Sequence, residues 1–341
     1  MTKLLQSRRA LGFLAVTATA ALALAGCSTS DKGSDAAEQS APVATETASV
    51  VEITDNHGTW EVATPPTSVV VTDNRLFQTL SDWGIEVAAM PVDLAPADSP
   101  FKADATVVNL GNHREPDLEA VVAVEPDLIL NGQRFAQYYE DMQQLAPEAV
   151  IIELDPREGE SFDDELRRQT ETLGKIFHKE AEAKELVDQF DASIARVKAA
   201  YQPDDMVMAV ITSGGNINYA APGDGRTLGP VYDILDLTPS LEADGSTDHQ
   251  GDEISVEAVA DSNPDIILVM DRDAGTSSSS GDEEYVPAAE LIADSAALQN
   301  VTAVKDGMIV YMPQHTYVNE GIQTYTEFFN TLADALEEAN A

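Results

Sequence analysis

The sequence predicts an α/β fold of two Rossmann-like lobes with mainly parallel sheets, joined by one long α-helix. Short apolar runs alternate with helix-like stretches, which is typical of βαβ units. One pattern occurs twice, as DLEAVVAVEPDLIL at 117–130 and SVEAVADSNPDIIL at 255–268, and a long amphipathic segment separates the copies. Two helix-turn-strand units of any α/β protein can look alike by chance. The intervening segment nevertheless favours two similar lobes and a connector.

The N-terminal residues 1–26 have the pattern of a secretory signal. A basic start precedes an apolar run at 11–24, and this order identifies an export signal rather than a folded element. The segment 24–27, Leu-Ala-Gly-Cys, resembles the lipobox of bacterial lipoproteins. The resemblance implies cleavage before Cys27 and acylation of that residue. Two adjacent arginines in the basic start leave both the general secretory route and the twin-arginine route open.

Cys27 is the only cysteine of the chain. An intramolecular disulfide, a catalytic thiol and a cysteine-rich metal site are therefore excluded. Residues 27–50, which begin with this cysteine, contain almost no large apolar side chains. Such a segment cannot bury enough surface to offset its ordering entropy, so we expect a flexible linker.

The charge of the chain excludes whole classes of partner. The formal net charge is −41 at pH 7, and loss of a signal with three basic residues and no acidic one takes it to about −44. Phosphate binding relies on a basic surface, so we expect no nucleic-acid partner. The same charge disfavours broad adhesion to anionic lipid. We interpret the excess acid as a solvated surface that keeps the protein soluble.

Residues 51–163 are expected to form the N-terminal lobe. The pattern VEITDNHGTWEV at 51–62 indicates a hairpin around residues 56–58. The apolar runs that follow are predicted strands: Val69–Val71, Val87–Ala89, Thr106–Val108, Leu128–Leu130 and Val150–Ile152. Helix-like stretches lie between several of them, for example at 76–83 and 135–145.

Residues 164–201 are expected to form the interlobe helix region. Apolar residues recur every three or four positions and charged residues occupy the other faces, which is the periodicity of an amphipathic helix. We expect a break near His178. From Lys179 to Tyr201 such a helix would run about 35 Å, long enough to cross from one lobe to the other.

Residues 202–341 are expected to form the C-terminal lobe. A buried strand at 206–211 opens it, and a turn-rich stretch follows at 213–229. The second copy of the repeat supplies a further helix and strand. A last strand at 308–312 precedes a C-terminal helix that ends at Ala339.

The familiar enzyme signatures are missing from the sequence. It contains no G-x-S-x-G, H-E-x-x-H or Walker A motif, so we expect a protein that is not an enzyme. Acidic residues are so numerous that a pair of carboxylates carries no information. The five histidines, at positions 57, 113, 178, 249 and 315, are too few for a dedicated divalent-metal receptor. A metal held wholly by the protein is therefore not expected.

Three arginines stand apart because chain-ending loops of a two-lobed protein should bring them together. Arg134 follows the strand at 128–130, Arg226 lies in the loop after the first strand of the second lobe, and Arg272 follows the strand at 266–270. Ligands of open α/β sheets bind beyond the carboxyl ends of strands, so these guanidinium groups would face one cleft. Each can bind an anionic oxygen in its fixed fork geometry. The alternative for each is a surface salt bridge.

Several segments together carry a family resemblance. They are Gly111–Leu130, Leu173–Phe177, Asn263–Asp265, Asp271–Arg272 and Ile309–Tyr311. In order and spacing they resemble the iron-siderophore substrate-binding proteins of bacterial ABC importers, and within these the branch that binds ferric catecholates. The resemblance covers the chain from His57 to the C-terminal helix. It implies a receptor of two α/β lobes joined by one long helix, with a shallow cleft and limited hinge motion.

The resemblance also implies ligand-binding residues. In this branch an arginine trio surrounds the anionic iron-catecholate centre, and Arg134, Arg226 and Arg272 correspond to it by motif context. A histidine and a tyrosine can complete the iron coordination, and these match His249 in Asp-His-Gln-Gly and Tyr317 in Thr-Tyr-Val. Fe(III) is a hard cation suited to phenolate oxygen, with imidazole acceptable as a further ligand.

The stretch before Tyr317 departs from the family pattern. It reads Pro-Gln-His at 313–315 and is shorter than in the family. His315 is therefore a rival ligand. A loop histidine at His249 with a packing role for Tyr317 is the plain alternative to iron ligation.

The remaining implications concern ligand, partners and location. The implied ligand is a ferric siderophore, and no intrinsic cofactor is expected. The implied partners are a permease and its ATPase, the lipid on Cys27 would hold the protein to the extracytoplasmic face of the cell membrane, and we expect a monomer. Glu119 and Glu257, matched in the two repeat copies, correspond to carboxylates that dock each lobe onto the permease.

Two alternative functions remain open. The same fold can bind heme, a corrinoid or a hydroxamate siderophore, and a remote alternative is a secreted metal-assisted hydrolase. The arginine trio with His249 and Tyr317 favours the catecholate, because neutral hydroxamate complexes need less cationic charge. The hydrolase would need a catalytic constellation that the sequence lacks.

Overall fold

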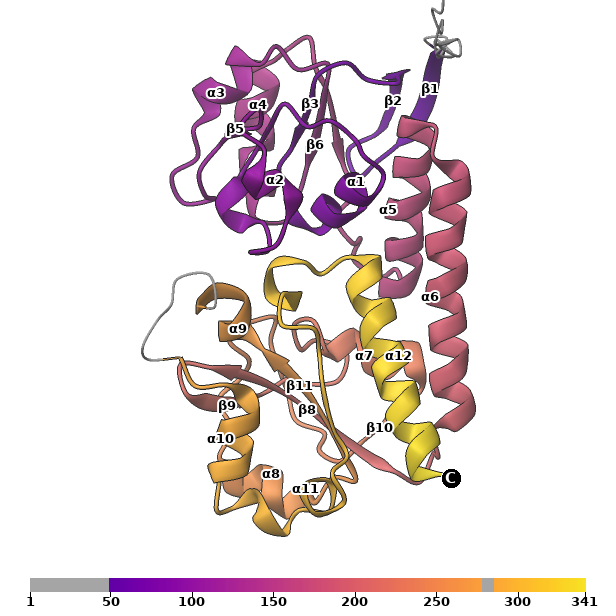
Figure 1. Ribbon diagram of the computed structural model, residues 1–341, viewed down its shortest axis with the longest axis vertical. Coiled ribbons are helices and arrows are strands. Elements are labelled where there is room, and N and C mark those ends of the chain that lie inside the picture. Colours follow the sequence, from indigo (N-terminus) through magenta and orange to yellow (C-terminus); the bar gives the residue numbers. More distant parts are fainter. Residues whose placement is uncertain (1–48, 278–284) are drawn as a thin grey trace, which may run out of the picture. The chain divides into compact units, whose positions relative to one another are not determined.

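The computed structural model in Figure 1 describes residues 49–277 and 285–341. Residues Glu46–Ala341 form one compact unit. The predicted signal peptide, the predicted lipidation at Cys27 and the linker up to residue 48 lie outside the described residues.

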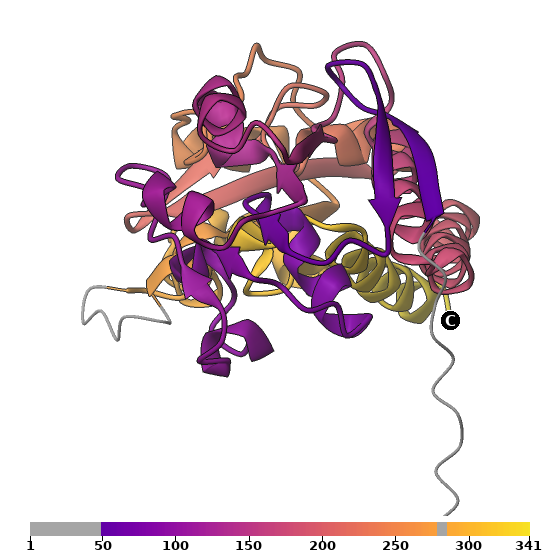
Figure 2. The same cartoon turned by 90° about the horizontal axis from the view of Figure 1, so that it is seen from above.

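A β-hairpin opens the described chain, as the sequence predicts. Strand β1 (Ser49–Thr54) pairs antiparallel with β2 (Thr59–Thr64). The Asp55 carboxylate organises the turn, because it accepts hydrogen bonds from the amides of His57 (2.8 Å) and Gly58 (2.9 Å). The hairpin packs beside the helices that follow the first lobe (Figure 2), where the Thr64 hydroxyl donates to a helix carbonyl at 2.5 Å.

The N-terminal lobe is built on a five-stranded parallel sheet with the order β5-β4-β3-β6-β7. Its strands are β3 (Val69–Val71), β4 (Ala89–Met90), β5 (Val108–Asn109), β6 (Leu128–Asn131) and β7 (Val150–Glu153). Its helices are α1 (Phe77–Asp82), α2 (Pro100–Ala103), α3 (Leu118–Ala123) and α4 (Tyr139–Leu145), with 3-10 turns η1 (Asn74–Leu76), η2 (Val92–Leu94) and η3 (Gln133–Tyr138). The chain crosses from one side of β3 to the other before β6, so β3 and β6 flank the switch point at which such sheets bind ligands.

Alternate residues of β6 pack on opposite faces of this sheet. Leu128 and Leu130 belong to a cluster that includes Ile176, whereas Ile129 belongs to a cluster that includes Val121 of α3. The three strand residues have no exposed surface. The sheet is therefore covered on both faces, as parallel sheets require.

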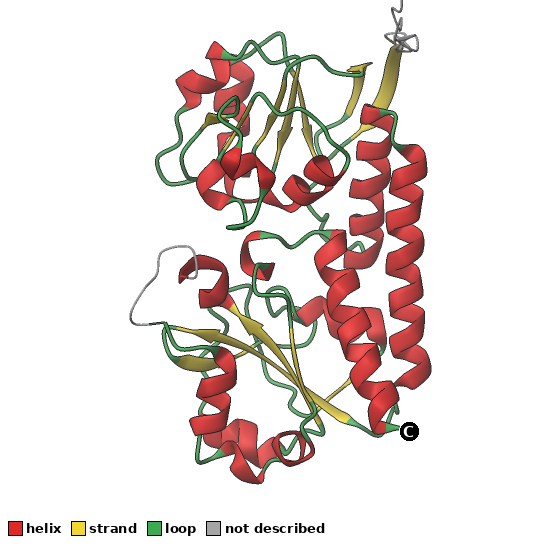
Figure 3. Ribbon diagram, in the orientation of Figure 1, coloured by secondary structure: helices red, strands yellow, loops and turns green. Residues whose placement is uncertain are grey.

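The C-terminal lobe repeats this plan with a five-stranded sheet that is mixed, because one strand is antiparallel. Its strands are β8 (Met206–Ser213), β9 (Asn216–Tyr219), β10 (Thr238–Pro239), β11 (Ile266–Asp271) and β12 (Ile309–Tyr311), in the parallel order β10-β8-β11-β12. Its helices are α7 (Gly229–Leu235), α8 (Val256–Ser262), α9 (Arg272–Ser277), α10 (Ala288–Asp294), α11 (Thr302–Asp306) and α12 (Ile322–Ala339), with 3-10 turns η4 (Leu298–Asn300) and η5 (Thr316–Val318). Figure 3 shows the helices arranged around the sheets.

The strand β9 corrects one expectation. The turn-rich stretch 213–229 is not wholly loop, because residues 216–219 fold back and pair antiparallel with β8. Gly214 and Gly215 form the connection with φ values of 57° and 76°, a left-handed backbone that glycine adopts without steric cost. Arg226 therefore follows this hairpin rather than β8 directly.

Helices α5 (Phe162–Phe177) and α6 (Glu180–Ala200) connect the lobes. The predicted break is confirmed at His178, which ends α5 with φ 54° in the left-handed region. A β-carbon at Gly174 would lie 2.7 Å from that of Ala183, so glycine permits the close approach of the two helices. The long helix α6 packs against α12 (Figure 1). At this contact the rings of Phe190 and Phe329 stack with their centroids 5.8 Å apart.

The sequence repeat has the same structural role in both lobes. Val121 of α3 and Val259 of α8 are both buried. The Asp127 carboxylate accepts from the amide of Ser68 at 3.0 Å, just before β3, and the Asp265 carboxylate accepts from the amide of Met206 at 2.9 Å, the first residue of β8. In each lobe the aspartate thus secures the start of the neighbouring central strand.

Candidate functional site

A buried cluster of ionised side chains, Asp73, Arg75 and Asp155, lies in the N-terminal lobe just beyond the carboxyl ends of β3 and β7. The Asp73 carboxylate accepts two hydrogen bonds from the Arg75 guanidinium, at 2.9 Å and 2.6 Å, and Asp155 accepts a third. Burial alone would lower the pKa of Arg75, but the charge and hydrogen bond of Asp73 together raise it. Arg75 therefore has a structural role, because its guanidinium is paired with two carboxylates.

The ion cluster holds the turn that carries Arg134. A β-carbon at Gly132 would lie 2.7 Å from an Asp73 carboxylate oxygen, so only glycine fits there. Gln133 has φ 52° and donates its amide to Asp155 at 2.9 Å and 3.1 Å. A non-glycine residue with positive φ is uncommon and persists where its surroundings enforce it. The turn after β6 is thereby fixed, and Arg134 follows it.

Tyr317 is the centre around which the predicted arginines gather. The guanidinium carbons of Arg134, Arg226 and Arg272 lie 5.0, 5.8 and 4.6 Å from the centroid of its ring. Arg134 comes from the N-terminal lobe, and the other two come from the C-terminal lobe. The Tyr317 side chain, in η5, is buried. The structure thus brings the trio together around one phenol, within the distance of a cation–π contact.

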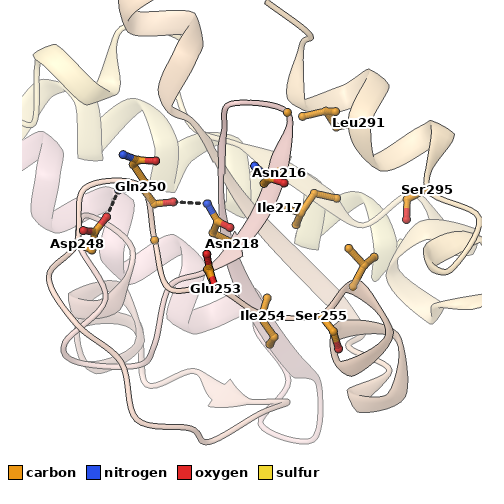
Figure 4. Close-up of a pocket in the computed structure, with 13 residues that line it drawn as sticks. Asn216, Ile217, Asn218, Asp248, Gln250, Glu253, Ile254, Ser255, Leu291 and Ser295 are labelled. Carbon is orange, nitrogen blue, oxygen red and sulfur yellow. Dashed lines mark hydrogen bonds between the residues drawn. The ribbon is translucent and has the colours of Figure 1, made fainter.

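His249 joins this group from the loop after β10. Its ring centroid lies 6.4 Å from that of Tyr317. The residues on either side, Asp248 and Gln250, line a pocket of about 870 Å³ (Figure 4), and the lining of this pocket contains no arginine or lysine. The Gln250 carbonyl accepts from Asn218 of β9 at 2.7 Å, which ties this loop to the sheet.

The arginines change the acidity of Tyr317. Burial by itself would raise the pKa of the phenol. Hydrogen bonding and positive charge from Arg134, with the charges of Arg272 and Arg226, outweigh burial and lower the pKa. The phenol of Tyr317 therefore loses its proton more readily than the phenol of an ordinary buried tyrosine.

His249 is held in its neutral form. Burial lowers the pKa of its imidazole, the charges of Arg272, Arg226 and Arg134 lower it further, and Asp248 opposes this. A neutral imidazole has one ring nitrogen free to accept a proton or a metal. The site therefore combines a phenol whose pKa is lowered and an imidazole whose pKa is lowered, both beside three guanidinium groups.

The three arginines have different partners. Arg226 pairs with the buried Glu320 at 2.8 Å, and Arg272 pairs with Asp273 at 2.9 Å. Arg134 donates to neutral oxygens of Asn74 (3.2 Å), Gln133 (3.1 Å) and the Tyr317 backbone (3.4 Å). Arg226 and Arg272 thus form ion pairs, as the salt-bridge alternative expected, although these pairs lie beside Tyr317 and are mostly buried. The oxygens that Arg134 contacts are neutral.

A pocket of about 450 Å³ lies over this group, within the size range of ligand sites. Arg134, Arg272 and Tyr317 line it, and His315 lines it as well, so the rival ligand shares the pocket. Arg226 instead lines an adjoining pocket of about 640 Å³ together with Arg134. The candidate site thus consists of two adjoining pockets, of about 450 and 640 Å³, and Arg134 lines both.

Several residues of the site were not foreseen from the sequence. Arg75 follows β3 just as Arg134 follows β6, so the rule that selected the trio would also have selected Arg75. His113 and Arg114 line the 450 Å³ pocket from the N-terminal lobe, and no pattern singled them out. Glu320 and Gln133 gave no signal, because one more acid or amide is uninformative in so acidic a chain.

The residues predicted to dock the permease occupy matching positions. Glu119 lies in the first turn of α3 after the cap Asp117, and Glu257 lies in the first turn of α8 after the cap Ser255. Both side chains are exposed. A carboxylate in the first turn of a helix is favoured by the helix dipole, so this placement alone does not identify a partner.

Residues 49–277 and 285–341 contain no helix that is both long and apolar enough to span a bilayer. In the same ranges, no group of three or more His, Cys, Asp or Glu side chains is arranged to hold a metal ion.

The fold and the site define a two-lobed α/β solute-binding protein with its candidate site between the lobes. Residues 69–316 match the family described as periplasmic binding protein, and the chain belongs to this family. Its members are extracytoplasmic substrate-binding receptors of ABC importers rather than enzymes.

Individual relatives support the assignment. The chain is 30% identical over 336 residues to the petrobactin-binding protein YclQ of Bacillus subtilis, covering 96% of this chain and 99% of YclQ. It is 28% identical over 231 residues to the ferric-anguibactin-binding protein FatB of Vibrio anguillarum, covering 67% and 70% of the two chains. The crystal structure of the catecholate-siderophore binding protein VctP of Vibrio cholerae shares the fold, with a TM-score of 0.71 at 23% identity over 85% of this chain and 100% of that one.

Proposed function

We propose that this protein is an extracytoplasmic receptor that binds a ferric catecholate siderophore between its lobes and delivers it to an ABC permease for iron uptake. One observation carries the proposal: three guanidinium groups from two lobes surround the buried phenol of Tyr317, 4.6 to 5.8 Å from its ring centroid. The protein binds and releases its cargo without covalent chemistry.

The charge of the site fits a ferric catecholate. Deprotonated catecholates leave the iron complex with net negative charge, and guanidinium groups bind such oxygens with charge-assisted hydrogen bonds. A neutral hydroxamate complex would gain less from three cations. In a chain of formal charge −41, a local concentration of arginine also attracts an anion that the rest of the surface repels.

Tyr317 and His249 are suited to the iron itself. In this proposal they complete the coordination of the cargo Fe(III) when the siderophore supplies fewer donors than the metal takes. Phenolate oxygen is a hard ligand for a hard cation, and neutral imidazole is an acceptable further ligand. The lowered pKa values of both groups favour the unprotonated forms that ligation needs.

The relatives support the ligand class. Two of them are proteins that bind petrobactin and ferric anguibactin, and a structural neighbour binds a catecholate siderophore. With them the proposal extends to the rest of the system: a permease and its ATPase as partners, Glu119 and Glu257 as the docking carboxylates, a lipid on Cys27 as the membrane anchor, and a monomeric receptor.

Parallel ligand titrations test the proposal. The mature protein would be titrated with ferric petrobactin, a ferric trihydroxamate, heme and a corrinoid, following the fluorescence of Trp60 and Trp83. We expect tight binding of the ferric catecholate and weaker responses to the others. Tight binding of the trihydroxamate, heme or corrinoid with no response to ferric petrobactin would reject the catecholate assignment.

A further inference from the structure

Glu320 is a buried carboxylate on the segment that carries Tyr317, and its oxygens are fully used. The side chain accepts hydrogen bonds from Arg226 at 2.8 Å, from the Gln133 amide at 3.1 Å and from the Thr227 hydroxyl. Burial alone would raise the pKa of Glu320, but the charge of Arg226 and the bonds from Thr227 and Arg226 lower it. The group is therefore ionised at neutral pH.

Gln133 extends this contact to the other lobe. Its side-chain nitrogen faces Glu320, and its side-chain oxygen accepts from the backbone amide of Arg134 at 2.9 Å and from the Arg134 guanidinium at 3.1 Å. The amide can satisfy both neighbours in one orientation only, because a carboxylate needs a donor and a guanidinium needs an acceptor. A continuous chain thus runs from Arg226 through Glu320 and Gln133 to Arg134.

We propose that Glu320 is a positioning residue of the ligand site, which acts through Gln133 to hold Arg134 and Arg226 in register at the Tyr317 ring. The proposal rests on the function proposed above. The two arginines belong to different lobes, so this chain also fixes the spacing of positive charge across the cleft. Charge-assisted contacts of this kind are strong enough to set guanidinium geometry.

The sign of the effect separates positioning from simple electrostatics. Glu320 partly neutralises the arginines, so loss of its charge alone would strengthen the binding of an anionic complex. Loss of positioning would weaken the same binding. Glu320→Leu keeps most of the volume of the side chain, removes its charge and removes the acceptors that hold Arg226 and Gln133.

A matched variant keeps the acceptor and removes the charge. Gln133 and the Nη2 atom of Arg226 donate to the same Glu320 oxygen, at 3.1 Å and 2.8 Å. In Glu320→Gln the amide oxygen takes the place of this oxygen and accepts both bonds, while the Thr227 hydroxyl turns to accept from the amide nitrogen. Glu320→Gln therefore keeps the chain from Arg226 to Arg134 without the charge of Glu320.

The dissociation constant for ferric petrobactin would be measured for the wild type and these variants, with thermal unfolding as a check of folding. We expect Glu320→Leu to weaken binding by about tenfold, the scale of one charge-assisted hydrogen bond, and Glu320→Gln to stay within about threefold of the wild type or to bind more tightly. Unchanged or tighter binding by Glu320→Leu would overturn the proposal, as would equal weakening in both variants. A wild-type protein that binds no ferric complex would reject the proposed function instead.

A further variant covers the case in which Glu320→Leu does not fold. Gln133→Asn retains an amide and suits the left-handed backbone at this position, but it is one methylene too short to bridge Glu320 and Arg134. The pair between Arg226 and Glu320 stays intact. We expect weaker ferric petrobactin binding with an unchanged unfolding temperature, and an unchanged dissociation constant would overturn the proposal.

Discussion

The guanidinium carbon of Arg272 lies 4.6 Å from the centroid of the Tyr317 ring, nearer than that of either other arginine of the trio. Its Nε atom is buried and has no hydrogen-bond partner among the described residues. Buried donors in native proteins are almost always satisfied, so under the proposed function we expect the ligand to supply an acceptor for this atom. Arg272 is therefore the arginine of the trio that we expect to gain most from ligand binding.

Replacement of Arg272 by alanine should weaken ferric petrobactin binding by about tenfold or more, because it removes a charge-assisted contact and one of three positive charges. Titration calorimetry would measure the change. Arg196→Ala is the matched control: it removes the same charge from an ion pair with Asp334 and Glu337 outside the pocket, and it should leave binding unchanged. Equal affinities for the two variants would assign Arg272 to a structural role.

Tyr317 should ionise at a lower pH than the other tyrosines of the ligand-free protein. Its pKa is lowered by the surrounding arginines, whereas burial raises the pKa of Tyr325 and Tyr219. Because folding lowers this pKa, the resulting stabilisation is full above the unfolded value of about 10 and is lost as the pH falls through the folded value. Ultraviolet difference absorbance of wild type against Tyr317→Phe would follow the phenolate. A difference spectrum centred at or above the unfolded value would contradict the expectation.

The repeated motif allowed the fold to be predicted from the sequence. Buried strands such as β6 and β11 are continuous apolar runs bounded by Pro-Asp, and long helices such as α6 and α12 show their period. Strand β9 was missed for a physical reason. Its residues Asn216–Tyr219 alternate between polar and apolar, but a run of only four residues is too short to identify a strand. The adjoining Gly214 and Gly215 indicate a turn without showing that the chain returns to pair with β8.

The candidate site could be predicted only in part from the sequence. Arg134 and Arg272 follow strands, so topology alone brings them to one edge of each sheet. The partners of Arg226 and Arg134 depend on side-chain contacts across the lobes, and no local pattern encodes these. Glu320 lies far from Gln133 in the chain, and only the folded structure brings the two together.

The buried cluster of Arg75 with Asp73 and Asp155 should be a large contributor to the stability of the N-terminal lobe. Arg75→Met leaves two carboxylates without their cation, one of them fully buried, and should lower the free energy of unfolding by about 3–5 kcal/mol. Urea denaturation would measure it. Lys184→Met, which breaks an exposed pair with Asp188, should cost less than about 1 kcal/mol. A loss at Arg75 no larger than this control would show that the cluster tolerates an uncompensated charge.

Charge reversal at Glu119 and Glu257 should separate delivery from binding. Both side chains are exposed in first helical turns and lie outside the lining of the 450 Å³ and 640 Å³ pockets. The double variant Glu119→Lys/Glu257→Lys should therefore bind ferric petrobactin like the wild type. If these carboxylates dock onto a basic surface of the permease, iron uptake by cells that depend on this receptor should be abolished, because like charges would then face each other.

The helix dipole sets the expected cost of this variant to folding. A lysine in the first turn is unfavourable by about 0.3–1 kcal/mol at each site, too little to unfold the protein. Glu185→Lys/Glu338→Lys is the control, since it makes the same change of charge at two exposed positions on α6 and α12. Uptake that survives in the first variant, or fails equally in both, would show that Glu119 and Glu257 are ordinary solvated carboxylates. Loss of uptake in the first variant alone, with binding intact, would identify one contact of the permease on each lobe.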